Sequence, residues 1–235
     1  MMKNIGMSLC LLLLLGCIIK ETDLMKIVLY SENRSDVLFT DNNTILLCYS
    51  SENRSKHYSV PEGVVKIAEG AFAYNQYLEK ISMPNSLLYI SNRAFYESEI
   101  QEVDIQEGLL EIGNEAFYQS KLRKIVFPRS LIKIGDAAFE GCNLVGLETL
   151  VLPERLLYLG TYAFFANPIP EQTMIELPSS LTTIGVDIFR FGESFENDWA
   201  PVYLVHQNSY ALEWAKEYDE DYIIIECWNN HRMLK

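Results

Sequence analysis

Residues 122–139 read LRKIVFPRSLIKIGDAAF, and this stretch decides the fold because the same residue types recur in the same order along the chain. Apolar residues stand three and one positions before Pro128, and Leu, Ile and Phe stand three, six and eleven positions after it. Six copies follow this pattern, with Gln106 in place of the proline in the third, and their phenylalanines are Phe72, Phe95, Phe117, Phe139, Phe164 and Phe189. Successive phenylalanines are 23, 22, 22, 25 and 25 residues apart.

A fixed period of about 20–29 residues rich in Leu and Ile is typical of a solenoid, in which no single unit buries its own hydrophobic face. The alternating residues before each proline predict a short strand that points its apolar side chains inward. The proline ends that strand because it has no N–H to donate. We expect the later Leu, Ile and Phe to pack beneath it, with each Phe in the core. Glycine follows the Ile or Leu in four copies, at Gly113, Gly135, Gly160 and Gly185, where it predicts a tight bend.

The consensus L-x-x-I-x-x-P-x-x-L-x-x-I-G-x-x-A-F resembles the bacterial BspA-type leucine-rich repeat. Residues 134–139, IGDAAF, and 112–117, IGNEAF, carry the resemblance most clearly. It implies a β-rich leucine-rich-repeat solenoid with short irregular or helical convex segments, in a family of surface proteins and lipoproteins. The resemblance predicts the function only loosely, because scaffolds of this kind serve many binding roles.

The N-terminus has the features of a lipoprotein signal peptide. Lys3 precedes a short apolar run that is far below the ~20 residues of a membrane-spanning helix. Gly16-Cys17 then resembles a lipobox, in which the cysteine thiol receives diacylglycerol and becomes the first residue after cleavage. The alternative is an ordinary secretory signal followed by an incidental cysteine. The residue after Cys17 is Ile18 rather than Asp, and this resembles the sorting pattern for the outer membrane. We therefore expect a lipid-anchored protein of the bacterial envelope, at the outer membrane or cell surface.

Charge and motif content exclude several classes of function. The formal net charge of −13 becomes −14 without Lys3, which argues against nucleic acid and against adsorption to anionic lipid. The dispersed cysteines Cys48, Cys142 and Cys227 and the three histidines lack the pair spacing of a zinc site, and we interpret the cysteines as buried small hydrophobes. No phosphate-binding loop, nucleophile elbow or metalloprotease motif is present, so we expect no cofactor, no small-molecule substrate and no catalysis.

Atypical units are expected to cap the two ends of the stack. Two β-rich segments, 37–40 and 44–49, predict an N-terminal hairpin, and a strand at 202–205, a helix from Ser209 to about Tyr218 and a strand at 222–226 predict a strand-helix-strand C-terminal cap. The predicted organisation is a signal peptide at 1–16, an anchor and hairpin cap at 17–57, six repeats at 58–199, a C-terminal cap at 200–227 and a tail at 228–235.

The exposed positions of the strands before the prolines form the candidate partner-binding face. The residues singled out there are Ser82, Asp104, Lys124, Val126, Thr149, Val151, Met174 and Glu176. Val126 and Val151 are the best contact candidates because such positions are usually polar, although ordinary β-propensity also accounts for valine on a strand. Six short strands give roughly 380 Å² of surface. That is about half of one side of a standard interface, so additional loops or many copies on one membrane would have to strengthen binding.

Two functions remain open at this point. The favoured one is a membrane-anchored surface lipoprotein that acts as a non-catalytic, adhesin-like module for a protein partner such as a host or matrix protein. The alternative is a structural envelope lipoprotein that contacts other envelope components or copies of itself.

Overall fold

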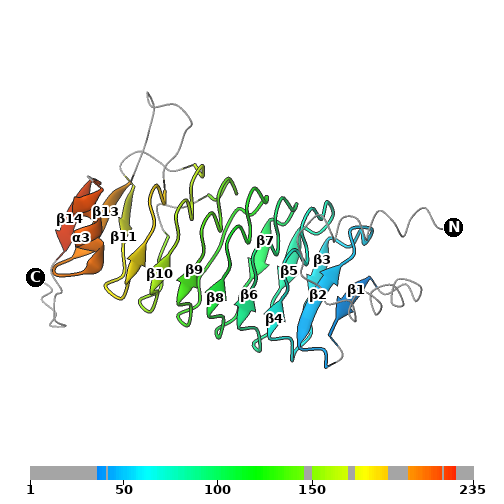
Figure 1. Cartoon of the computed structure of the whole chain (residues 1–235). Coiled ribbons are helices and arrows are strands. Elements are labelled where there is room, and N and C mark those ends of the chain that lie inside the picture. The colour runs from blue at the N-terminus through cyan, green and yellow to red at the C-terminus, as the bar shows by residue number, and fades with distance from the viewer. Residues whose placement is uncertain are drawn as a thin grey trace, which may run out of the picture.

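The computed structural model describes residues 36–40, 42–145, 150–168, 173–189, 201–218 and 220–225. The chain forms a β-solenoid of about seven turns, with mostly parallel strands and little helix. The coils stack side by side between a blue N-terminal end and a red C-terminal end (Figure 1). The solenoid predicted from the sequence is therefore confirmed. The predicted signal peptide at 1–16 and Cys17 lie outside the described residues.

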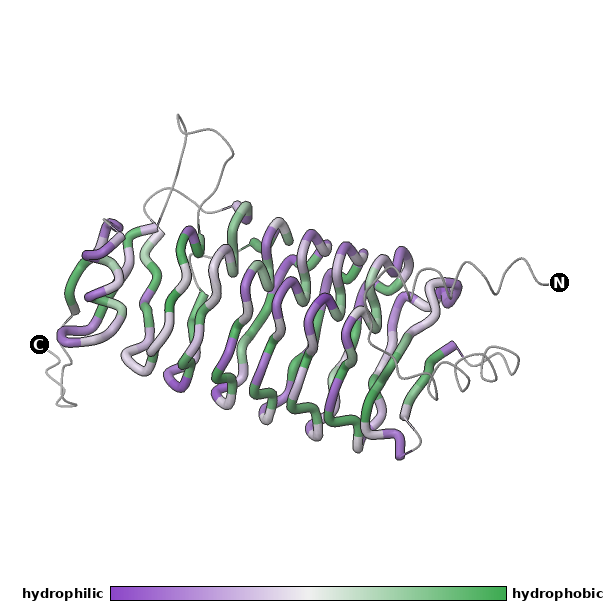
Figure 2. Tube along the Cα trace, viewed as in Figure 1, coloured by the Kyte–Doolittle hydropathy of each residue, from purple (hydrophilic) through white to green (hydrophobic). Residues whose placement is uncertain are grey.

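One sheet runs along most of the solenoid. Its strands, in spatial order, are β1 (Val37–Phe39), β2 (Ile45–Tyr49), β4 (Lys66–Ile67), β6 (Tyr89–Ile90), β8 (Glu111–Ile112), β9 (Lys133–Ile134), β10 (Tyr158–Leu159) and β12 (Thr183–Ile184). β1 and β2 pair antiparallel as the predicted hairpin, and the remaining neighbours pair in parallel. In each repeat strand the Ile or Leu six positions after the proline points inward. Apolar residues consequently recur at matching places in successive coils (Figure 2).

The strands before the prolines lie in two smaller sheets, the second of which also contains two strands of the C-terminal cap. One contains β3 (His57–Ser59), β5 (Lys80–Ser82) and β7 (Glu102–Asp104), and the other contains β11 (Met174–Glu176), β13 (Val202–His206) and β14 (Tyr222–Ile225). The prediction of a strand before every proline is therefore correct in four copies and wrong in the fourth and fifth. In the fourth copy Lys124 makes an isolated bridge to Glu102, and residues 150–152 of the fifth copy form no strand.

Three extra residues in the fifth repeat explain this interruption. The amide of Val145 donates to the carbonyl of Arg123 at 2.8 Å, as the amide of Arg123 donates to Gln101 one coil earlier. Val145 and Arg123 both stand six residues after their phenylalanines, so the coils are still in register there. The 25-residue spacing from Phe139 to Phe164 then places the additional residues between Val145 and Pro153. The pre-proline segments of the fourth and fifth copies do not pair as a result.

A column of phenylalanine rings forms the core, as predicted. All six repeat phenylalanines are at most 1% exposed, and adjacent rings lie 4.7–5.2 Å apart, with 1–9° between their planes. Tyr203 continues the aromatic contacts beyond Phe189, and the Trp214 ring meets Tyr203 edge-on at 5.3 Å. The column therefore extends into the C-terminal cap.

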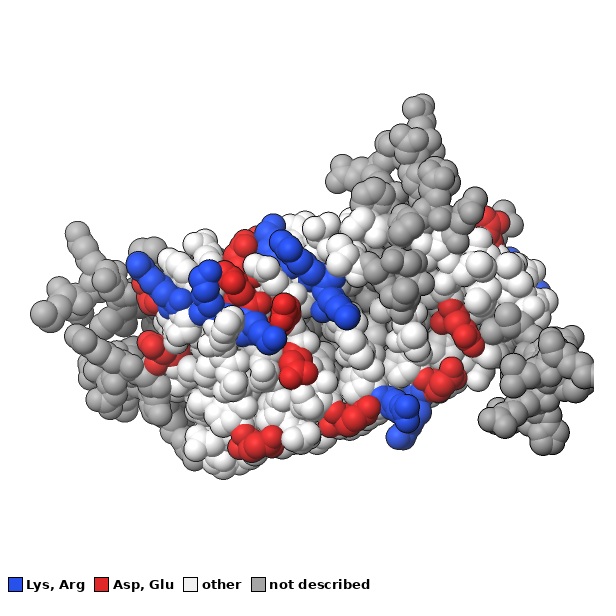
Figure 3. Space-filling model, turned by 180° about the vertical axis from the view of Figure 1, so that it is seen from behind, with Lys and Arg blue, Asp and Glu red and all other residues white. Residues whose placement is uncertain are grey.

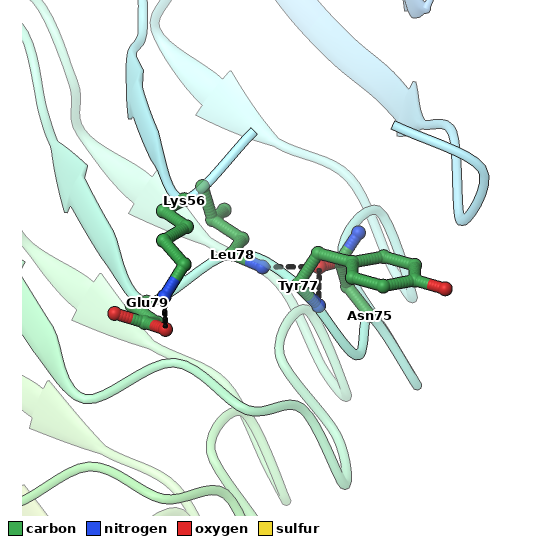
Figure 4. A network of polar contacts seen from close by, with 5 residues as sticks. All are labelled: Lys56, Asn75, Tyr77, Leu78 and Glu79. Atoms are coloured by element: carbon green, nitrogen blue, oxygen red, sulfur yellow. Dashed lines mark hydrogen bonds and ion pairs between the residues drawn. The ribbon is translucent and has the colours of Figure 1, made fainter. Parts of the chain in front are cut away.

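A buried polar column lies beside the phenylalanines, three residues after each of the first five. Its members are Asn75, Ser98, Ser120, Cys142 and Asn167, all at most 2% exposed. The Asn75 side-chain oxygen accepts the amides of Tyr77 and Leu78 (Figure 4). Asn167 donates to the carbonyls of Phe139 and Phe164, and its oxygen accepts the amide of Leu144. These side chains satisfy backbone groups of the turns that would otherwise be buried without partners.

The glycines after the inward Ile or Leu serve close approach rather than a bend. None of the four has a positive φ, so the predicted reason is wrong. A Cβ on Gly135 would lie 2.5 Å from the Asn114 nitrogen of the preceding coil, and one on Gly185 would lie 2.1 Å from the Thr161 nitrogen. Any larger residue would push the coils apart at this edge.

The predicted C-terminal cap is confirmed as β13, α3 (Tyr210–Glu217) and β14. The Ser209 hydroxyl accepts the amide of Leu212 at 3.2 Å, which makes Ser209 the helix N-cap. α3 buries Ala211, Leu212, Trp214 and Ala215. This buried face covers the apolar end that the last coil would otherwise expose.

Replacing Phe117 with Ala should lower the free energy of unfolding by ~3–5 kcal/mol. Phe117 is fully buried and stacks on Phe95 and Phe139, so its removal leaves a cavity in the middle of the column. Denaturant unfolding measures the change. Phe165→Ala is a matched control at a half-buried ring and should show a much smaller loss. A Phe117→Ala midpoint equal to that of the parent would contradict the role of the column.

Cys142 should resist thiol reagents in the folded protein. Burial raises the pKa of its thiol to about 12, so it stays protonated at pH 8–9, where an unfolded cysteine with a pKa near 9.0 ionises. The measurement is the rate of reaction with a chromogenic disulfide in a soluble form that begins after Cys17 and carries Cys48→Ser and Cys227→Ser, so that Cys142 is its one thiol. We expect fast reaction in denaturant and very slow reaction without it. Equal rates would show that the polar column opens readily.

Candidate protein-binding face

The predicted contact residues lie along one side of the solenoid, which is called here the pre-proline face. Its members among the described residues are Ser82, Asp104, Lys124, Val126, Val151, Met174 and Glu176. All are exposed except Ser82, which is half-buried, and Thr149 lies outside the described residues. Val126 and Val151 are 69% and 79% exposed, so the predicted outward direction of both valines is confirmed.

A hollow of about 770 Å³ lies where the pre-proline strands fail to pair. Its lining is mostly apolar and comes from both sides of the interruption: Ile125, Val126 and Phe127 from the fourth copy, Leu150, Val151 and Leu152 from the fifth, and Leu144 and Val145 from the chain between them. Ile125, Phe127 and Leu150 are only partly buried against the core, in contrast to the fully buried phenylalanine column. This apolar surface is therefore accessible.

A second hollow of about 590 Å³ adjoins the first and extends over β5 and β7. The two hollows share Lys124, Ile125 and Val126. Asp104 belongs to the lining of the second hollow. Together they form one continuous depression from the second to the fifth copy, which is called here the pre-proline groove.

Backbone amides along this groove lack the hydrogen bonds that their counterparts make elsewhere. In intact copies the residue before the proline donates to the next coil, as Val60 does to Ser82 and Met83 to Asp104. Among the described residues, the corresponding amides of Ile105, Phe127 and Leu152 donate to no other backbone carbonyl. The groove thus combines apolar side chains with unpaired strand edges.

Charges on the face change character along its length. Near the N-terminal end, Lys56 pairs with Glu79 at 2.7 Å (Figure 4), and Lys80 pairs with Glu102 at 2.8 Å. The hydrogen bond between Lys80 and Glu102 raises the pKa of the ammonium group and lowers the pKa of the carboxyl group. In each exposed pair the two opposite charges lie on adjacent coils and neutralise each other.

Basic side chains around the groove are not neutralised in this way. Four of them, Arg123, Lys124, Arg129 and Arg155, line the hollows and make no ion pair within the part of the chain that the structure describes. Figure 3 shows one face of the molecule, on which blue and red side chains are interleaved toward one end and white surface lies directly beside the central blue group. Farther on, the Glu176 carboxylate lies 3.1 Å from His206. The groove is therefore locally basic on an acidic protein.

The groove was not predicted, because a regular repeat pattern implies a continuous strand layer. Lys124, Val126 and Val151 were among the predicted contact residues, whereas the partly buried Ile125, Phe127 and Leu150 were not. The 25-residue spacing between Phe139 and Phe164 was the available signal. An insertion of three residues within a parallel stack must displace some backbone, and Val145 is an exposed apolar residue at the place where it does so.

No group of three or more His, Cys, Asp or Glu side chains in the described ranges could hold a metal ion. Cys142 is buried as predicted, whereas Cys48 is only half-buried and Cys227 lies outside the described residues. Within those same ranges, no helix has the length and hydropathy required to cross a bilayer.

Comparison with known proteins supports the same repeat assignment. Residues 47–169 and 110–215 match the family model described as BspA type leucine rich repeat region, with six copies. No curated protein matches the chain.

Two solved structures are similar. A leucine rich cell surface protein from Faecalibacterium prausnitzii is 23% identical, with a TM-score of 0.41, over 62% of this chain and 32% of that one. The pneumococcal vaccine antigen PcpA is 22% identical, with a TM-score of 0.43, over 80% of this chain and 46% of that one. The chain therefore spans about a third and about half of the lengths of these two proteins.

Proposed function

The chain belongs to the BspA-type leucine-rich repeat family, and from this premise we propose that it is a non-catalytic, protein-binding module of the bacterial cell surface. A lipid on Cys17 holds it to the membrane, and the pre-proline face meets a protein partner such as a host or matrix protein. The signal-like residues 1–16 and the Gly16-Cys17 pair support the anchor. The regular solenoid supports a binding role rather than catalysis, because such repeats supply extended surfaces.

The observation that carries this proposal is the pair of exposed valines beside an open apolar groove. Val126 and Val151 both line the larger hollow, and neither is buried by the core. Contiguous accessible apolar surface with a polar rim is typical of interaction sites. The groove also enlarges the contact surface beyond the small flat area estimated from the sequence, because a partner can contact its walls as well as its rim.

A structural envelope role is the second candidate, and the C-terminal edge favours it. Among the described strands β14 is the outermost of its sheet, and Ile223 and Ile224 on it are each 48% exposed. An unpaired apolar strand edge is a natural site for contact with another chain. Capture of partners from envelope extracts and from host matrix, in separate experiments, discriminates between the two candidates.

Replacing Cys17 with Ser should abolish lipid attachment, because the thioether requires the cysteine thiol. We expect the variant to lose incorporation of radiolabelled palmitate and to move from the detergent phase to the aqueous phase. A Cys48→Ser variant controls for loss of a thiol elsewhere and should keep both properties. Palmitate in the Cys17→Ser protein, or a parent that never enters detergent, would contradict the anchor.

Replacing Val126 and Val151 with Glu should weaken partner capture, because carboxylates would be desolvated without partners at the contact. Stability should change by less than about 1 kcal/mol, since both side chains are exposed. Leu157→Glu is a matched control, because Leu157 is 44% exposed and lies directly before β10 in the long sheet. Unchanged capture by the double variant would move the binding surface away from this face.

A further inference from the structure

The pre-proline groove has three properties that together define one kind of occupant. Its floor and walls are apolar, its edges carry unpaired backbone groups, and its rim is basic. We infer that the groove binds an extended peptide in which acidic and apolar side chains alternate. The inference rests on the proposed function, since it names the chemistry that the binding face would recognise in a protein partner.

An unpaired backbone amide in the groove favours an extended strand over other shapes of peptide. In intact copies the amide before the proline donates to the next coil, and the corresponding amide of Phe127, at the gap between the fourth and fifth copies, donates to no other backbone carbonyl within the described residues. A peptide strand added in this gap supplies a carbonyl for the Phe127 amide and gains affinity through its main chain. The side chains of an extended strand alternate between its two faces, so one set can enter the groove while the other remains at the rim.

The apolar set fits the floor. Ile125, Phe127 and Leu150 are partly buried and line the larger hollow, whose volume of about 770 Å³ is ample for several aliphatic side chains. A peptide with charged side chains alone would leave this apolar surface exposed to water. Apolar residues at every second position would cover it and would gain free energy in proportion to the area removed from water.

The acidic set fits the rim. Lys124, Arg129 and Arg155 line the larger hollow with a single carboxylate, Glu154. Arg123 joins them at the smaller hollow, where the carboxylates are Asp104 and Glu102, and Glu102 is paired with Lys80. Lys80 is satisfied by Glu102, whereas these four cations have no ion-pair partner within the described ranges. Carboxylates of the peptide would complete the pairs, and Arg can hold them with two parallel hydrogen bonds. A basic peptide would instead meet uncompensated like charge.

The test uses fluorescence anisotropy with the full-length protein and a fluorescein-labelled peptide in which Glu and Val alternate. Binding should weaken by about tenfold or more in Lys124→Glu and in Arg155→Glu, and it should weaken as salt is raised. Lys66→Glu is the matched control, because Lys66 is an exposed cation on β4 in the other sheet, and it should bind like the parent. Thermal unfolding checks that every variant is folded.

Three further peptides separate the contributions. A peptide of alternating Lys and Val should not bind, because it repeats the charge of the rim. The Glu–Val peptide with N-methyl groups along both edges should bind weakly, because the methyl groups block the approach of its main-chain carbonyls to the groove backbone. Polyglutamate should also bind weakly, because it lacks apolar side chains.

Several results would overturn the inference. Equal binding of polyglutamate would make the groove a polyanion site, and equal binding of the Lys–Val peptide would remove the role of charge. A protein dimer in sedimentation that Lys124→Glu dissociates would assign the groove to a second copy of the chain. Capture of a protein partner that is lost in the Val126/Val151 double Glu variant, without any peptide binding, would leave the proposed function standing and remove this inference. Peptide binding without capture of any protein from envelope extracts or host matrix would support this inference and count against the proposed function.

Discussion

The structure depends on the fixed distance between successive coils at the phenylalanine column. Neighbouring rings lie 4.7–5.2 Å apart, close to the ~4.8 Å between hydrogen-bonded strands. The backbone enforces the same step, since the amide of Phe117 donates to Ala138 and that of Phe139 donates to Ala163. Stacking and hydrogen bonding therefore require one common spacing. The glycines reinforce it, because a Cβ on Gly135 would overlap the backbone of the coil before it.

This shared spacing determines where the solenoid can tolerate a change in length. Phe139 and Phe164 remain stacked at 5.2 Å although their repeat is three residues longer than its two predecessors. The extra residues cannot enter the column without separating the rings. The repeat spacing places them between Val145 and Pro153 in the sequence, in the part of the repeat that contains the pre-proline segment. The strand layer breaks there and the core does not, which produces an accessible groove in a molecule whose stack remains continuous.

Periodicity revealed much of this fold from the sequence, and local geometry supplied the rest. The phenylalanine column, the hairpin cap, the helix with Ser209 as its N-cap and the outward valines all follow from apolar spacing and capping rules. The backbone conformation around each phenylalanine does not follow from these rules. Arg93, Glu115, Ala137, Tyr162 and Asp187 stand two residues before their phenylalanines with φ between 49° and 57°, where glycine would be the usual signal. Each of the first four donates its amide to the next coil at 2.8–3.0 Å, and this bond offsets a conformational cost of roughly 1–2 kcal/mol. A hydrogen bond between two coils leaves no pattern in the sequence of a single repeat, so these positive-φ positions could not be predicted from the sequence.

The overall charge of the protein does not determine which ligands the groove recognises. A net charge of −13 describes the whole chain, yet the two hollows of the groove are lined by five cations and three carboxylates. Electrostatic screening acts over ~8 Å at physiological salt, so a ligand in the groove interacts mainly with the charges that line it. Distant carboxylates still repel an acidic partner during its approach, and this repulsion grows as salt falls. The local and global charges therefore oppose each other for an acidic ligand. That opposition selects partners with enough apolar contact to remain bound once they arrive, and the exposed floor of the groove provides that contact.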